Sequence, residues 1–100
     1  MALMFGGTIA DLHTRGWCTD FKQVGYIKST PNNNGATKAA CAAYKKRNTG
    51  TQQWDTCPDC TPQQLANSPD FICLSPLNHI GGDEWNYYCL QAGAYASEAE

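Results

Sequence analysis

The stretch "WDTCPDC", residues Trp54 to Cys60, places two cysteines two positions apart. This spacing occurs in redox enzymes, in zinc sites and in domains held together by disulfides. The choice among the three decides the fold class, because only the third uses covalent cross-links as the main support of a small core.

The whole set of cysteines favours the disulfide interpretation. An even number of cysteines in a chain of 100 residues is typical of a small disulfide-bonded domain. The six are Cys18, Cys41, Cys57, Cys60, Cys73 and Cys89. Six cysteines allow 15 pairings, among which the sequence does not choose. We predict only that Cys57 and Cys60 do not pair with each other, because their ring would be very small, and that each bonds to a distant partner.

Two other interpretations of the pair stay open. Cys57, Cys60, Cys73 and His79 have spacings found in zinc sites, but they leave three other cysteines without a role. A thioredoxin-like redox site has a tryptophan directly before its first cysteine and a strand before the motif. Here Trp54 stands three residues away, and "NTGTQQ" precedes it.

The apolar pattern predicts an α+β fold. In the two expected main helices, Thr37 shares a face with Cys41 and Tyr44, and Trp85 shares a face with Cys89. A capping signal at Thr61 predicts a short third helix. We expect the helices to pack on a small antiparallel sheet within a single domain, residues 1–100. A small β-barrel is the alternative. We expect strands within residues 2–28, with a bend between Phe21 and Val24, and a further strand over 71–74. The expected helices span 36–50 and 81–94, and the short third helix begins at residue 61. Residues 96–100 are expected to be a frayed tail.

Composition excludes several classes of function. The net charge is −2 and only 16% of the residues are charged, so we expect no nucleic-acid partner. No apolar run approaches the ~20 residues of a membrane span. The opening "MALMFGGTIA" lacks the marks of a secretory signal, so we expect a mature secreted, extracellular domain whose signal peptide has been removed. We expect no cofactor.

No catalytic motif is present in the sequence. It contains no nucleophile elbow, phosphate loop or His-Glu-x-x-His pattern. A small secreted hydrolase such as a nuclease would need its charged groups to converge on a phosphate. The available side chains are those of His13, Arg15, His79 and Glu84. The acidic composition disfavours this alternative, and we expect a protein that is not an enzyme.

Three segments carry a resemblance to a known class of proteins. "WDTCPDC", "ICLSP" and "HIGGDEWNYYCLQAGA" are similar to segments of small secreted cysteine-rich proteins of filamentous fungi, many of which are effector or elicitor candidates. The resemblance covers about residues 37 to 98. It implies an apoplastic, disulfide-bonded, non-enzymatic protein that acts by binding, and it transfers no binding residues.

The expected function is therefore binding to a host protein or a cell-wall component. Exposed aromatic side chains are favoured in interfaces. Tyr87 is turned away from the apolar face of its predicted helix, which makes it a candidate for the partner surface. The full candidate surface is Tyr87, Tyr95, Lys45, Lys46 and Arg47.

Overall fold

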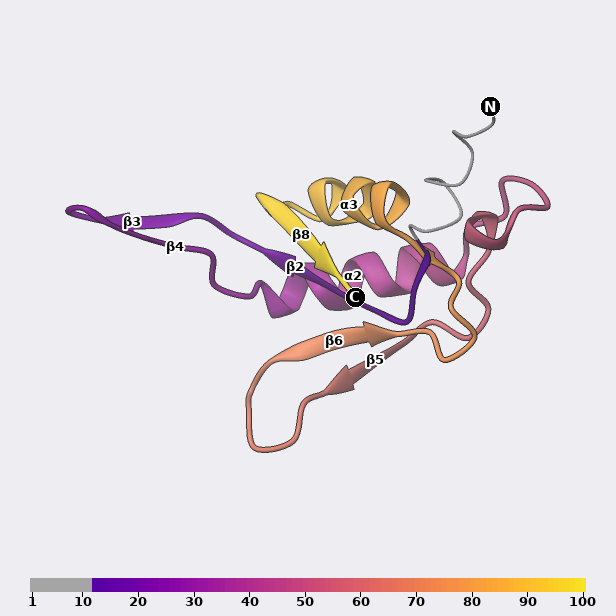
Figure 1. Ribbon diagram of the computed structural model, residues 1–100, viewed down its shortest axis with the longest axis horizontal. Helices are drawn as coiled ribbons and strands as arrows, with labels where there is room; N and C mark the ends of the chain where they lie inside the picture. Colours follow the sequence, from indigo (N-terminus) through magenta and orange to yellow (C-terminus); the bar gives the residue numbers. More distant parts are fainter. Residues whose placement is uncertain (1–11) are drawn as a thin grey trace, which may run out of the picture.

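The computed structural model describes residues 12–100. It contains two α-helices, α2 (Asn34–Lys45) and α3 (Gly82–Gln91), and one 3-10 turn, η1 (Gln53–Asp55). The strands are β1 (Leu12–His13), β2 (Arg15–Thr19), β3 (Lys22–Val24), β4 (Ile27–Ser29), β5 (Thr61–Gln64), β6 (Phe71–Leu74), β7 (Ile80–Gly81) and β8 (Ala96–Ala99). This α+β arrangement agrees with the fold class predicted from the sequence (Figure 1).

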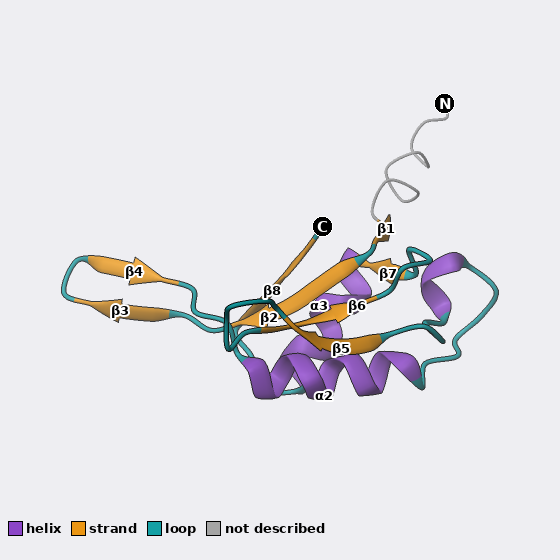
Figure 2. Ribbon diagram, turned by 90° about the horizontal axis from the view of Figure 1, so that it is seen from below, coloured by secondary structure: helices purple, strands orange, loops and turns teal. Residues whose placement is uncertain are grey.

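The main sheet has four strands in the order β5-β6-β2-β8, and all of its pairs are antiparallel. Gly16 lies opposite Cys73 of β6, and Cys18 is two residues further along β2, so all three share one face. Cys73 is bonded to α2 and Cys18 to α3, so both helices pack on this same face. The separate β3–β4 hairpin extends away from this body (Figure 2).

Helix α2 forms where a local cap and a periodic apolar face coincide. The Asn33 side-chain oxygen accepts a hydrogen bond from the Ala36 N–H at 2.9 Å, which satisfies a free donor at the helix start. Thr37, Cys41 and Tyr44 are buried, as the 3.6-residue periodicity predicts. The helix ends at Lys45 and not near Gly50, which lies against the carboxylate of Asp55.

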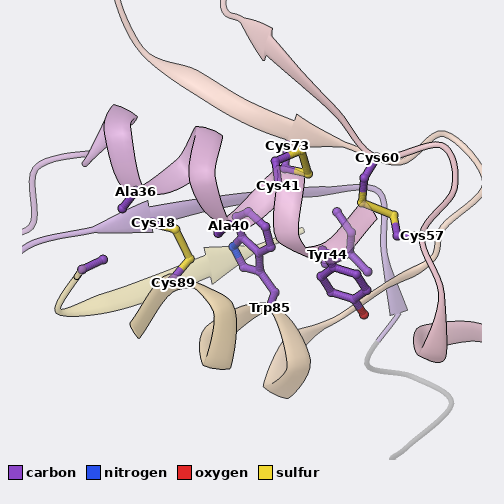
Figure 3. Packing of buried hydrophobic residues seen from close by; sticks show 12 residues of the cluster. Cys18, Ala36, Ala40, Cys41, Tyr44, Cys57, Cys60, Cys73, Trp85 and Cys89 are labelled. Atoms are coloured by element: carbon purple, nitrogen blue, oxygen red, sulfur yellow. A yellow bond between two sulfur atoms is a disulfide. The ribbon is translucent and has the colours of Figure 1, made fainter. Parts of the chain in front are cut away.

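Helix α3 supplies the other half of the core. Trp85 and Cys89 are fully buried, and Tyr88 and Ala92 pack partly buried beside them, which confirms the predicted face. The largest buried side chains, Trp85 and Tyr44, lie with ring centroids 6.4 Å apart between the two helices (Figure 3). The core is therefore a thin layer of two large aromatic rings, small alanines and cystines.

The predicted third helix is wrong. Thr61–Gln64 form the edge strand β5, which pairs with Phe71–Leu74. All four residues of β5 are exposed, so a helix here would have no apolar face to bury. An edge strand also tolerates Pro62, because the missing N–H can face solvent. The short helical turn lies earlier, at η1.

The predicted frayed tail is also wrong. Residues Ala96–Ala99 form β8, which pairs with β2 from Gly16 to Thr19. The aromatic-rich segment before it forms α3, so the barrel alternative is not what the described residues adopt. The bend predicted between Phe21 and Val24 lies earlier, at residues 20–21 between β2 and β3, and Lys22–Val24 are a regular strand. The strands expected before residue 12 lie outside the described residues.

Candidate functional site

Three disulfides connect the elements of the body. Cys18–Cys89 joins β2 to α3, and Cys41–Cys73 joins α2 to β6 (Figure 3). All six cysteines are bonded, as the even count predicted. The two long-range bridges fix both helices to the same sheet face, so the core needs little further apolar area.

The prediction that Cys57 and Cys60 avoid each other is wrong, because they form the third disulfide. The chain makes a tight turn here, with the Cys60 N–H donating to the Cys57 carbonyl at 3.1 Å. The turn brings the two Cα atoms to 5.3 Å, an ordinary separation for a disulfide, so closing the small ring requires no displacement of the backbone.

The CPDC loop is attached to the rest of the molecule by Asp59 as well as by its two cysteines, which are buried in the core. The Asp59 carboxylate accepts hydrogen bonds from the Ser75 hydroxyl and the Leu77 N–H, each at 2.8 Å. Ser75 is fully buried and its hydroxyl in turn accepts from the His79 N–H at 3.0 Å. The loop thus links the segment after β6 to the start of β7.

The zinc alternative does not have the expected geometry. The sulfurs brought together are those of Cys41, Cys60 and Cys73, all within 4.8 Å of one another. Each of these sulfurs belongs to a disulfide and offers no thiolate, the form that binds zinc. The His79 Nδ1 atom lies 2.8 Å from the Gln53 carbonyl oxygen, so this ring is engaged with η1.

The nuclease set does not form a connected site. Arg15 pairs with Glu100 at 3.8 Å. His13 lies beside Gly82, and the Glu84 carboxylate turns back toward Gly81. Within residues 12–100, no hydrogen bond joins any two of the four side chains proposed for a hydrolase. Nothing in this arrangement supports a nucleophile–base pair.

The predicted partner surface is only partly accessible. Tyr87 and Tyr95 are exposed, as are Lys45 and Lys46. The Arg47 side chain, by contrast, is only 14% exposed. Its guanidinium lies 5.6 and 5.7 Å from the ring centroids of Tyr44 and Tyr88 and 3.7 Å from an Asp55 oxygen. Arg47 therefore joins the end of α2 to η1 and α3.

Asp55 is held in its charged form by several partners. The Thr49 hydroxyl donates to it at 2.6 Å and the Gln52 N–H at 3.0 Å. These hydrogen bonds, and then the Arg47 cation, lower the pKa of the Asp55 carboxyl from its ordinary value. Arg47 and Asp55 are thus matched structural charges and not a free recognition pair.

Among residues 12–100, the β3–β4 hairpin is the most exposed apolar feature, and the sequence interpretation did not single it out. Its tip carries Val24 at 65% exposure, a fully exposed Tyr26 and Ile27 at 74%. Gly25 has a φ of 60° in the two-residue turn, as a type II′ hairpin requires. The signal in the sequence was Gly25-Tyr26 between two β-branched residues, which is a two-residue hairpin pattern.

Tyr95 lies at the base of this hairpin. Its ring centroid is 5.4 Å from that of Phe21, the residue that precedes β3. The Tyr95 N–H donates to the Thr19 carbonyl at 2.9 Å, which fixes the segment after α3 against the end of β2. One of the residues predicted for the partner surface is therefore continuous with the hairpin.

A shallow hollow of about 240 Å³ lies elsewhere on the body. It is lined by Arg15, Trp17, Asn32, Leu65, Ile72 and Glu100. Trp17 and Ile72 alternate with the helix-facing Cys18 and Cys73, so the hollow is on the sheet face opposite the helices. Its one cation, Arg15, and its one anion, Glu100, already pair with each other.

Two helices clamped by disulfides onto one face of a small antiparallel sheet define a small cysteine-rich α+β domain. The chain belongs to the biotrophy-associated secreted protein 4 family, whose model matches residues 11–98. No curated protein and no solved structure matches it. Family membership confirms the resemblance to small secreted fungal effector-like proteins and the extracellular location. Among residues 12–100, no helix has the length and apolar character needed to cross a bilayer.

Proposed function

We propose that this protein is a non-enzymatic secreted effector-like protein that binds a host or cell-surface component through its β3–β4 hairpin. The observation that carries the proposal is the tip, where Val24, Tyr26 and Ile27 expose most of their side-chain surface. Monomeric soluble proteins rarely expose clustered apolar side chains without a binding role.

The construction of the hairpin supports a recognition role. Every residue of β3 and β4 is exposed, so neither face of the hairpin packs on the body. A lone two-stranded hairpin is marginally stable in water, and these residues contribute no apolar area to the core. The disulfide-clamped body presents the hairpin, with the Phe21–Tyr95 contact at its base.

A second candidate surface consists of Tyr87, Lys45 and Lys46. Tyr87 is 55% exposed and is held edge-on against Tyr88, with ring centroids 5.2 Å apart. An exposed aromatic side chain is favoured in protein interfaces. This surface is smaller than the hairpin tip and has one aromatic anchor.

Binding of fluorescently labelled protein to host cells, with capture from host apoplastic fluid, tests both surfaces. We expect the triple variant Val24→Thr, Tyr26→Ser, Ile27→Thr to lose binding, because the substitutions remove the apolar tip. The two threonines keep strand propensity, and serine is a common turn residue at position 26. Tyr87→Ala is the matched variant at the second candidate surface, and we expect it to bind like wild type. Loss of binding in Tyr87→Ala with retention in the triple variant would transfer the role to the second surface.

A further inference from the structure

We infer that the β3–β4 hairpin binds an anionic lipid surface, with its tip entering the interface between headgroups and acyl chains. This inference rests on the proposed function and names the kind of partner. The tip is Val24, Gly25, Tyr26 and Ile27. Val24 and Ile27 are directly opposed partners, so they share one face, and Tyr26 stands between them in the turn. A tyrosine among aliphatic side chains is the composition favoured where apolar and hydrated layers meet.

The charges of the hairpin match such a surface. Residues 21–30 contain Lys22 and Lys28 and no acidic residue. Lys22 is two residues from Val24, which at about 3.3 Å per residue places it roughly 7 Å above the level of the apolar pair. An interfacial apolar segment reaches about 5–10 Å into the boundary, so the Lys22 ammonium falls near the phosphate level when the tip is inserted. Lys28 is one residue from Ile27, about 3 Å above it and on the other face of the hairpin, and its long stem lets its ammonium reach the same level. Their alkyl stems add apolar contact below that level.

The rest of the protein favours a tip-first orientation. With the two lysines of the hairpin set aside, the chain keeps five basic and nine acidic side chains. The acid nearest along the chain, Asp20, lies at the hairpin base and accepts hydrogen bonds from the Asn33 amide at 3.1 and 3.2 Å. An anionic membrane therefore attracts the hairpin and repels the body.

The dimensions of the tip favour lipid over a protein partner. A stable protein interface buries about 800 Å² on each side, which three side chains on a narrow hairpin do not supply. A lipid surface needs no complementary pocket. The exposed Lys22, Gln23 and Lys28 also discourage the addition of another strand to the hairpin edges.

Flotation with unilamellar vesicles tests the inference. The probes are vesicles of phosphatidylcholine alone and of phosphatidylcholine mixed with phosphatidylserine. We expect wild type to bind the mixed vesicles roughly thirtyfold more tightly at low ionic strength, since two lysines contribute, and to lose this preference in high salt. The triple tip variant should bind neither vesicle. Lys22→Gln with Lys28→Gln should abolish the preference between vesicles, and Tyr87→Ala should float like wild type.

Several results would overturn the inference. Wild-type protein that floats with neither vesicle would overturn it, and so would a tip variant that floats like wild type. A wild-type dimer that the tip substitutions dissociate would show instead that the tip binds a second copy of the chain. Circular dichroism and intact disulfides in every variant exclude misfolding as the cause. Hairpin-dependent binding to host cells without vesicle binding would reject the lipid inference and leave the proposed function standing. If vesicle binding needs the hairpin but binding to host cells does not, the proposed function is rejected and the lipid inference stands.

Discussion

The Tyr44 hydroxyl accepts a hydrogen bond from the Gly81 N–H at 3.0 Å and donates to the Trp54 carbonyl oxygen at 2.8 Å. One buried phenol on α2 thereby joins η1 to the residue that caps α3. No disulfide connects these three segments directly, so this hydroxyl is their shared polar link.

Replacement of Tyr44 by Phe tests this link. The ring and its packing on Trp85 and Tyr88 remain, but the Gly81 N–H and the Trp54 carbonyl lose their partner. An unpaired buried backbone group costs about 1–3 kcal/mol, so we expect the free energy of unfolding to fall by about that amount. Guanidinium unfolding followed by tryptophan fluorescence measures the change. Wild-type stability in Tyr44→Phe would show that water replaces the hydroxyl at no cost.

The same phenol predicts a loss of stability in alkali. Burial raises the pKa of Tyr44 from 10.0 to about 12, because the ionised form would be poorly solvated. The folded state thus holds the proton more tightly than the unfolded chain. Its contribution to stability is complete below pH 10 and declines as the pH rises from about 10 to about 12. Denaturant midpoints measured across this range should fall more steeply in wild type than in Tyr44→Phe.

Gly16 is required by the position of Trp85. A Cβ atom at Gly16 would lie 2.7 Å from Nε1 and 2.8 Å from Cε2 of the indole, which is fully buried and donates to the Trp17 carbonyl at 3.2 Å. We expect Gly16→Ala to lower the free energy of unfolding by about 1–3 kcal/mol through overpacking. Gly35→Ala in α2 is the matched control. Its Cβ would meet only an Asn33 oxygen at 3.7 Å, so that substitution should be neutral or stabilising.

The three disulfides should differ in their contribution to stability. For sequence separations of 71, 32 and 3, the chain-entropy relation gives about 4.4, 3.7 and 1.6 kcal/mol. Replacing both cysteines of a pair by alanine should therefore destabilise the protein most for Cys18–Cys89 and least for Cys57–Cys60. Thermal unfolding of the three double variants measures the order. A larger loss for the Cys57–Cys60 variant than for the Cys18–Cys89 variant would contradict this explanation.

The sequence predicted the elements whose signals are local. The buried faces of α2 and α3 follow from apolar side chains at helical spacing, and Phe71–Leu74 from a short apolar run. Strand β8 has no such signal, because its four residues are small or acidic and gain their structure from backbone pairing with β2, about 80 positions earlier. The edge strand at Thr61 was missed because its residues carry a helix-capping pattern, whereas the strand forms by hairpin pairing with β6 across residues 65–70.

The candidate site was predicted less well than the fold. The count of cysteines indicates disulfides, but the Cys57–Cys60 pairing depends on the direction of one turn that residue types do not specify. Arg47 was grouped with its neighbours Lys45 and Lys46, although only the packed structure shows that the arginine is covered by two rings. The hairpin was recognisable from its turn, but its exposure follows from the absence of any element packed on it.

The different environments of Arg47 and Lys46 provide a final test. Arg47→Ala removes the ion pair with Asp55, the hydrogen bond to the Tyr88 hydroxyl at 3.4 Å and the packing of the stem on two rings. We expect a loss of about 1–3 kcal/mol in the free energy of unfolding, because the partners are mostly buried. Lys46→Ala, one residue away and exposed, should change it by less than about 0.5 kcal/mol. Equal effects of the two substitutions in urea unfolding would show that Arg47 acts only as a surface charge.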